Sequence, residues 1–279
     1  MLKRVITGTC VLLALVVLVI FSGTVAFPIS FAAIGVVCLY EMFKCMGMHK
    51  NVSLVLPPYL SALAFPFLLR YMDSNVKVAL IAAIVALLYL IYVFAHVIWS
   101  HGKFAFNEGM SVYAAALYIL LALNAVLYIR DFGDSGKYIF VLIFIGAWVT
   151  DTFAYFTGML FGKHKLIEDV SPKKTIEGSI GGILFCALFF VGFGFITELF
   201  FERNANMLFL AVSGVIASVI SQVGDLIMSV IKRHYGIKDY GKIFPGHGGM
   251  LDRFDSILAV SVGITCICMF AALTGISLI

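Results

Sequence analysis

Carboxylate side chains inside apolar stretches are the first sign of chemistry in this sequence. Asp151 and Asp225 each lie within a run of apolar residues long enough to cross a bilayer. A charge at the centre of such a span costs about 2.5–3.5 kcal/mol on insertion scales, so each carboxylate needs a compensating partner. Counted back from Arg233, Asp225 lies about eight residues inside its span, or roughly 12 Å at helical rise. We therefore expect Asp225 to face a wet cavity rather than lipid.

Two further acids begin the last apolar run. Asp252 and Asp255 lie at positions i and i+3, so on a helix they share one face near its N-terminus. With Asp225 they offer hard oxygen ligands, which favour Mg²⁺ bridging to substrate phosphates, and no cluster of Cys and His accompanies them as zinc would require. Asp225, Asp252 and Asp255 are therefore the predicted metal ligands. Helix-dipole stabilisation is the alternative for the two acids at the helix start.

The helix that carries Asp225 continues with a polar face. Ser229 and Lys232 follow at offsets of four and seven residues, and Arg233 comes next. We interpret this face as one wall of a site for an anionic substrate. A polar seam that holds helices together is the alternative.

The segment after Arg233 combines basic residues with glycine. Three glycines surround His247, and the segment leads directly into a helix N-terminus, where backbone N–H groups can approach an anion. This is phosphate-site chemistry, although flexibility alone also accounts for a glycine-rich turn. The candidate residues of this segment are Lys238, Asp239, Gly246, His247, Gly248 and Gly249.

A second polar loop, residues 161–177, ends in Ser-Pro-Lys-Lys-Thr followed by an acid and a glycine at the start of an apolar run. We expect this loop to touch substrate phosphate. Basic residues that only set membrane topology or bind anionic lipid are the alternative. The candidates are Lys173, Lys174, Thr175 and Glu177.

The elements that must position these residues are membrane spans. Apolar residues make up 62% of the 279-residue chain and charged residues 12%, against about 25% charged residues in soluble domains. Runs of about 20 apolar residues, the length that crosses a bilayer, recur throughout. We predict an all-α, polytopic helical membrane bundle of about nine transmembrane helices, near 5–23, 25–43, 53–71, 77–99, 110–129, 138–160, 178–200, 206–231 and 252–278.

The chemistry is concentrated in the second half of the chain. We therefore divide the chain into an N-terminal region, 1–135, with about five helices, and a catalytic region, 136–279, with about four helices and two cytoplasmic loops. Glu41 is the one notable acid of the first region. Because it lies at the end of a span, we expect its carboxylate to reach water.

The basic residues predict the orientation in the membrane. Only five of the 19 Lys and Arg residues fall on one side of the predicted spans, which leaves 14 on the side of the N-terminus and of loops 161–177 and 232–251. The positive-inside rule makes that side cytoplasmic. The basic pI is thus explained by topology, without nucleic-acid binding. A cleaved signal peptide is an alternative for the first apolar run, but we prefer an uncleaved helix because of its length.

The stretch from Ser229 to Asp255 resembles the signature of phosphatidate cytidylyltransferases, also called CDP-diacylglycerol synthases. That pattern contains Ser, Lys-Arg, Lys-Asp, a small residue, Pro-x-His-Gly-Gly and Asp-Arg-x-Asp. Two other stretches, 151–163 and 171–178, are similar to the same family, although Ile176 stands where members often have an aromatic residue. The resemblance covers roughly residues 145–256. The matching positions are Ser229, Lys232, Arg233, Lys238, Asp239, Gly241, Pro245, His247, Gly248, Gly249, Asp252, Arg253 and Asp255.

This resemblance implies that CTP and phosphatidic acid condense to CDP-diacylglycerol and pyrophosphate, with Mg²⁺ as cofactor and a second, monovalent cation left open. The active site would face the cytoplasm, in a bacterial inner membrane. The implied catalytic residues are Asp225, Ser229, Lys232, Arg233, Lys238, Asp239 and His247. The implied substrate-binding residues are Lys173, Lys174, Thr175, Glu177, Asp151, Gly246, Gly248, Gly249 and Arg253.

Two other functions stay open. A CTP-dependent enzyme acting on a polyprenol or an ether lipid would need similar charged residues. An ion-coupled transporter would use Asp151 and Asp225 as ion sites, but it leaves the basic, glycine-rich loop unexplained. The small-residue seam from Gly178 to Gly182 packs either within one chain or between two, and we prefer a homodimer.

Overall fold

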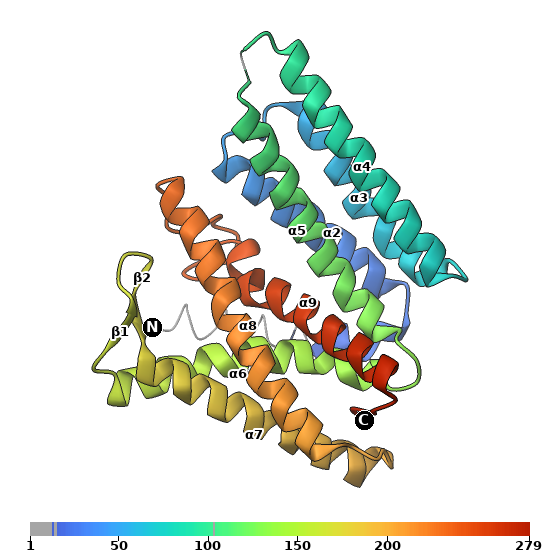
Figure 1. The fold of residues 1–279 in the computed structure, drawn as a ribbon, viewed down its shortest axis with the longest axis vertical. Coiled ribbons are helices and arrows are strands. Elements are labelled where there is room, and N and C mark those ends of the chain that lie inside the picture. Colours follow the sequence, from blue (N-terminus) through green and yellow to red (C-terminus); the bar gives the residue numbers. More distant parts are fainter. Residues whose placement is uncertain (1–12, 14–15, 103) are drawn as a thin grey trace. The chain divides into compact units, whose positions relative to one another are not determined.

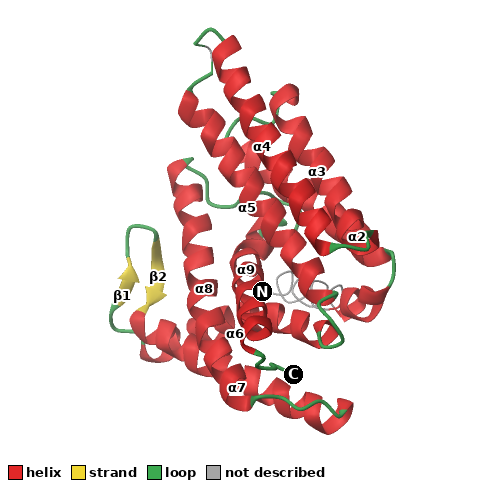
Figure 2. Ribbon diagram, turned by 45° about the vertical axis from the view of Figure 1, so that its right-hand side comes forward, coloured by secondary structure: helices red, strands yellow, loops and turns green. Residues whose placement is uncertain are grey.

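The structure is a computed structural model that describes residues 13, 16–102 and 104–279. It consists of long helices and one short hairpin (Figures 1 and 2). In chain order the elements are η1 (Phe21–Gly23), α2 (Ala26–Cys45), α3 (Val52–Tyr71), α4 (Asn75–Trp99), α5 (Phe106–Arg130), α6 (Gly136–Phe161), β1 (Lys165–Ile167), β2 (Ser171–Thr175), α7 (Ile176–Phe201), α8 (Met207–His234) and α9 (Leu251–Thr274).

The helices confirm a polytopic helical membrane protein. Within the described part of the chain, eight helices, α2 to α9, are long and apolar enough to cross a membrane. Each coincides with a predicted span. Of the other predicted span, 5–23, the structure describes only residues 13 and 16–23. The last helix ends at Thr274 rather than at 278, because Gly275 adopts a left-handed φ of 72° that ends the helix.

The chain forms two compact units. The first unit consists of residues up to Leu127 together with Ile237–Asp252, and the second of Tyr128–Gly236 together with Arg253–Ile279. The chain therefore leaves the second unit after α8, contributes a loop to the first, and returns near the start of α9. The division of chemistry between residues 1–135 and 136–279 stays a prediction.

In the first unit, α2 packs on α3 and α3 on α4. Helix α3 contains the pair Pro57-Pro58, which lacks two backbone N–H groups and so cannot bond to the carbonyls of Ser53 and Leu54. The hydroxyl of Tyr92 donates to the Ser53 carbonyl at 3.1 Å, and that of Tyr89 donates to the Leu54 carbonyl at 3.0 Å. Helix α4 thus satisfies the acceptors that the two prolines leave open.

In the second unit, a glycine seam brings α6 and α7 together. A Cβ atom on Gly181 would overlap the side chain of Thr157, and one on Gly182 would lie 3.0 Å from the Thr150 carbonyl oxygen. Gly178 likewise packs on α6, at the Ala154 carbonyl. The small residues are therefore used inside the chain, between α6 and α7, and the homodimer stays a prediction.

Small residues also bring α8 and α9 close together. A Cβ atom on Gly224 would overlap Ala259, and Gly263 of α9 lies against Ile220. Helix α8 also contacts α6, because the Thr150 hydroxyl donates to the Ser218 hydroxyl at 2.9 Å. These close approaches place Asp225, the neighbour of Gly224, where α6, α8 and α9 meet.

The loop between α6 and α7 is a hairpin, which the sequence did not predict. Strands β1 and β2 pair antiparallel, with Lys165 opposite Thr175 and Ile167 opposite Ser171 (Figure 2). Strand β2 leads without a break into α7, and the Thr175 hydroxyl caps that helix by accepting from Gly178 N at 3.1 Å. The hairpin thereby fixes two of the predicted phosphate-binding lysines at the end of a helix.

Candidate active site

Three carboxylates from three helices gather in the second unit. Asp151 lies on α6, Asp225 on α8 and Asp255 on α9, close enough for their charges to repel one another. The Asp151 carboxylate accepts a hydrogen bond of 2.9 Å from the Ser256 hydroxyl. Because carboxylates inside membrane spans are costly unless compensated, this cluster has to be balanced by cations or hydrogen bonds.

The balance is provided by cations from the same unit. The Lys174 ammonium lies 2.6 Å from Asp225 Oδ2, and both side chains are about four-fifths buried, with 22% and 23% exposed. Asp255 is attracted by Lys232, which is only 9% exposed, and Asp151 is attracted by Arg253. Each carboxylate therefore has a basic partner, and the family resemblance assigns all six residues to the site.

A pocket of about 270 Å³ opens beside this cluster. Asp151 and Asp225 line it from two helices, and the hairpin contributes Lys173, Lys174 and Thr175. Both charge signs thus face one cavity. Such a lining suits a phosphate-bearing ligand, with or without a cation, better than a neutral one.

Glu177, whose binding of substrate stays a prediction, joins the two ends of the hairpin in the structure. Its carboxylate accepts hydrogen bonds from Lys163 N at 3.1 Å and His164 N at 3.3 Å, and it contacts the His164 ring at 2.7 Å. The side chain is absent from the pocket wall as far as the described residues define it. Its observed contacts hold the loop that carries Lys173 and Lys174.

The glycine-rich loop, which belongs to the first unit, is folded around Asp252. The Asp252 carboxylate, in a residue only 5% exposed, accepts from Tyr240 N at 2.8 Å and Gly249 N at 2.9 Å. Gly246 and Gly248 have left-handed φ angles of 82° and 83°, which only glycine adopts easily. Asp252 therefore orders the loop through its backbone.

A carboxylate from α2 holds the same loop, and sequence reasoning missed it. Glu41 is 2% exposed, so the expectation that it reaches water is wrong. Its two carboxylate oxygens accept from Met250 N at 3.1 Å and Leu251 N at 2.7 Å, at the start of α9. A signal does exist in the sequence, because an acid in an apolar span needs a partner.

The remaining candidate residues differ in solvent exposure. Ser229 is nearly buried on α8, and Arg233 is exposed in the last turn of that helix. Lys238 and Asp239 are exposed on the loop of the first unit, and His247 is half-buried there. The second unit thus brings together Asp151, Lys174, Asp225, Lys232, Arg253 and Asp255, and the first brings together Glu41, Gly241, Gly248, Gly249 and Asp252.

The donor atoms suit a hard cation such as Mg²⁺, since the clustered ligands are carboxylate oxygens. Within the described ranges, however, no three His, Cys, Asp or Glu side chains are arranged as a ready ligand set. The Lys174 ammonium also lies 2.6 Å from Asp225 Oδ2, so the two groups form an ion pair. Ligation by Asp225, Asp252 and Asp255 stays a prediction.

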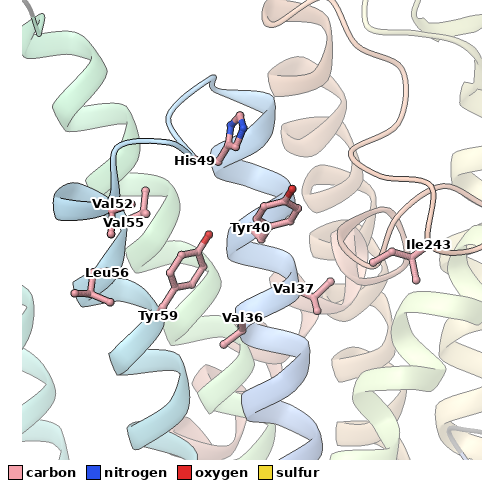
Figure 3. Close-up of a pocket in the computed structure, with 9 residues that line it drawn as sticks. All are labelled: Val36, Val37, Tyr40, His49, Val52, Val55, Leu56, Tyr59 and Ile243. Atoms are coloured by element: carbon pink, nitrogen blue, oxygen red, sulfur yellow. The ribbon is translucent and has the colours of Figure 1, made fainter.

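The first unit contains a different kind of pocket, of about 450 Å³, between α2, α3 and the loop. Its lining is mostly aliphatic, with the rings of Tyr40, His49 and Tyr59, and Ile243 forms the wall on the loop side (Figure 3). Such a surface suits hydrocarbon rather than a triphosphate.

Comparison with known proteins identifies the family. The sequence model described as the cytidylyltransferase family matches residues 2–271. The chain belongs to the cytidylyltransferase family. It is 35% identical over 266 residues to a Bacillus subtilis protein named phosphatidate cytidylyltransferase, covering 92% of this chain and 94% of that protein. Proteins of the same name from Staphylococcus epidermidis and Staphylococcus aureus are 32% and 33% identical over 259 and 261 residues, covering 92% of this chain and 95% of each relative.

These matches extend the family assignment to both units. The residues that first suggested it lie between 145 and 256, whereas the matches include the helices of the first unit and Glu41. The predicted family is confirmed.

Proposed function

We propose that this membrane protein condenses CTP with phosphatidic acid to give CDP-diacylglycerol and pyrophosphate. The observation that carries the proposal is the cytidylyltransferase family match together with relatives that bear the name phosphatidate cytidylyltransferase over nearly their whole length. The charged pocket of the second unit provides support from chemistry, because it combines carboxylates and lysines at a cavity.

In the proposed reaction, a phosphate oxygen of phosphatidic acid attacks the α-phosphorus of CTP. The bond from that phosphorus to the oxygen bridging the α- and β-phosphates breaks, and the β- and γ-phosphates leave as pyrophosphate. The chain therefore has to align two anions and neutralise their charge, without a covalent intermediate. Lys173 and Lys174 on the hairpin face the pocket and are suited to bind the triphosphate.

Mg²⁺, when bound, would screen the phosphates and make the α-phosphorus more electrophilic. We propose that Asp225, Asp252 and Asp255 hold it. The Lys174 ammonium can then pair with either of two anions, the Asp225 carboxylate or the substrate phosphate. Its flexible aliphatic stem lets it exchange one for the other. Ser229, Lys232, Arg233, Lys238, Asp239 and His247 remain the proposed catalytic set around this centre.

The location of the reaction follows from the two substrates. Phosphatidic acid keeps its acyl chains in the bilayer, whereas CTP is dissolved in water, so the chemistry has to occur at the membrane boundary. We propose that the hairpin and the glycine-rich loop face the cytoplasm, as the distribution of basic residues predicts. The relatives are bacterial proteins, which supports an inner-membrane location.

The test is a release assay with purified, detergent-solubilised protein. Pyrophosphate and CDP-diacylglycerol are measured together, with CTP, phosphatidic acid or Mg²⁺ omitted in turn. We expect equal amounts of both products, and only when all three are present. If product formed from a polyprenol phosphate or an archaeal-type ether lipid but not from phosphatidic acid, that lipid would be the acceptor instead of phosphatidic acid. Substrate flux into proteoliposomes without CTP would favour a transporter instead.

A further inference from the structure

We propose that Glu41, on α2, is a positioning residue for the reaction. It fixes the turn from Gly246 to Asp252 and thereby sets the orientation of the Asp252 carboxylate. The inference rests on the proposed function, in which this turn belongs to the active site. It assigns a role in the reaction to α2, a helix of the first unit.

The first line of argument is the hydrogen bonding of the Glu41 carboxylate. One oxygen accepts from Met250 N at 3.1 Å and the other from Leu251 N at 2.7 Å. The first N–H groups of a helix have no partner within it, and α9 begins at Leu251. A carboxylate from a distant helix therefore caps α9, and its negative charge is favourable at the positive end of the helix dipole.

The second line of argument comes from two glycines. A Cβ atom on Gly241 or on Gly249 would overlap the Glu41 carboxylate. Neither residue has a left-handed φ, in contrast to Gly246 and Gly248. The loop thus requires glycine for two separate reasons, backbone conformation at 246 and 248 and space for Glu41 at 241 and 249. Flexibility does not account for the second pair.

The third line connects Glu41 with Asp252. Asp252 Oδ2 accepts from Gly249 N at 2.9 Å, and Glu41 binds the two N–H groups that follow in the chain. Both carboxylates are nearly buried, with Glu41 2% and Asp252 5% exposed. The three consecutive N–H groups of residues 249–251 are therefore divided between them. Loosening Glu41 frees two of these groups and weakens the turn that presents Gly249 N to Asp252, while the hydrogen bond from Tyr240 N to Asp252 stays.

The test compares wild type, Glu41→Gln and a matched control in the full-length protein. Glu108→Gln makes the same chemical change in the same unit, at an exposed acid at the start of α5 that accepts from Ala105 N at 2.8 Å. Hydrogen exchange of the amides of Met250 and Leu251 is measured without substrates. For Glu41→Gln we expect exchange to accelerate about tenfold, since a buried N–H loses a charged acceptor. Glu108→Gln should match wild type.

Kinetics with CTP, phosphatidic acid and Mg²⁺ provide the second readout. Substitutions of outer-shell partners typically cost about 10–100-fold in metal affinity or activity. We therefore expect Glu41→Gln to raise the half-saturating Mg²⁺ concentration about tenfold or more. A residue needed only for folding would lower the active fraction and leave that concentration unchanged. Glu41→Asp keeps the charge on a shorter side chain and should be intermediate in both readouts, which provides a second variant if the glutamine protein does not fold.

The inference would be overturned if the Met250 and Leu251 amides of Glu41→Gln exchanged hydrogen as slowly as those of wild type. An unchanged half-saturating Mg²⁺ concentration would overturn it as well. Failure of the proposed function looks different. In that case wild type itself makes no CDP-diacylglycerol, while the exchange measurement still tests whether Glu41 holds the turn.

Discussion

The charged pocket of the second unit and the glycine-rich loop of the first unit compensate their carboxylates in opposite ways. In the pocket, Asp225 is paired with the side chain of Lys174 at 2.6 Å. In the loop, Glu41 and Asp252 are held by backbone N–H groups. A lysine can leave its partner when another anion arrives, whereas a backbone amide is fixed by the fold. The acid of the pocket is therefore compensated by a side chain, and the acids of the loop are compensated by the backbone.

The largest effect is expected from Asp225→Asn. Removing this charge should lower turnover about 100-fold or more, because a metal-assisted phosphoryl centre contributes several kcal/mol of charge stabilisation. The measurement is the initial rate of CDP-diacylglycerol formation, with the melting temperature as a check on folding. Asp169→Asn, in the exposed turn of the hairpin in the same unit, is the matched control. Near-normal turnover in Asp225→Asn would show that the pocket is not the reaction centre.

A smaller effect is expected from Lys174→Met. It removes the partner of Asp225 and one cation for the triphosphate, and loss of one member of a desolvated pair costs about 2 kcal/mol or more, or roughly 30-fold in kcat/KM for CTP. Lys174→Arg keeps the charge and should retain more activity than the methionine variant. If both variants bind CTP as wild type does, Lys174 only balances Asp225 and does not exchange partners.

Glu177→Gln tests whether the contacts that join the two ends of the hairpin are needed to position its lysines. The change weakens hydrogen bonds to two backbone N–H groups and to His164, so the lysines of β2 should be less well placed. We expect the KM for CTP to rise about threefold to tenfold, in line with about 0.5–1.5 kcal/mol for one ordinary hydrogen bond, because the amide oxygen of glutamine can still accept. Glu168→Gln, in the exposed hairpin turn, is the control. A drop in kcat with an unchanged KM would instead point to a direct role of Glu177 in the chemistry.

The smallest effects are expected from two tyrosines of α4, a helix that contains none of the candidate site residues. Tyr89→Phe and Tyr92→Phe each remove the hydroxyl that satisfies a carbonyl opposite the two prolines of α3. Each should lower the free energy of unfolding by about 0.6–1.5 kcal/mol without changing the KM for CTP. Tyr71→Phe, at the exposed end of α3, should leave stability unchanged. Equal stability of all three variants would contradict this role of the two tyrosine hydroxyls.

The membrane spans were predictable because apolar run length alone specifies them, and each described span appears as expected. That Asp151 and Asp225 need compensating partners was also predicted, since isolated charges in apolar helices are costly, whereas the gathering of Asp151 with Asp225 and Asp255 was not. The hairpin was not, because strands of three and five residues carry too little alternation to distinguish them from a basic loop.

The role of Glu41 shows where sequence reasoning ended. Its partners are the backbone N–H groups of residues 250 and 251, more than 200 positions further along the chain. Backbone groups leave no trace in residue type, so only the glycines at 241 and 249 hint at the contact, and glycine is common in loops because it also serves tight turns. Glu177 was predicted to bind substrate, which stays a prediction, and its acceptor role toward the loop backbone was hidden for the same reason.

The central claim is that a lipid phosphate attacks the α-phosphorus of CTP. The most direct measurement supplies purified protein, phosphatidic acid and Mg²⁺ with CTP labelled either at the α- or at the γ-phosphate, and follows the label into the lipid extract. We predict that the α-label enters the lipid and that the γ-label stays in water as pyrophosphate. A γ-label in the lipid would make the protein a CTP-dependent kinase, and no label in the lipid from either CTP would contradict the proposed reaction altogether.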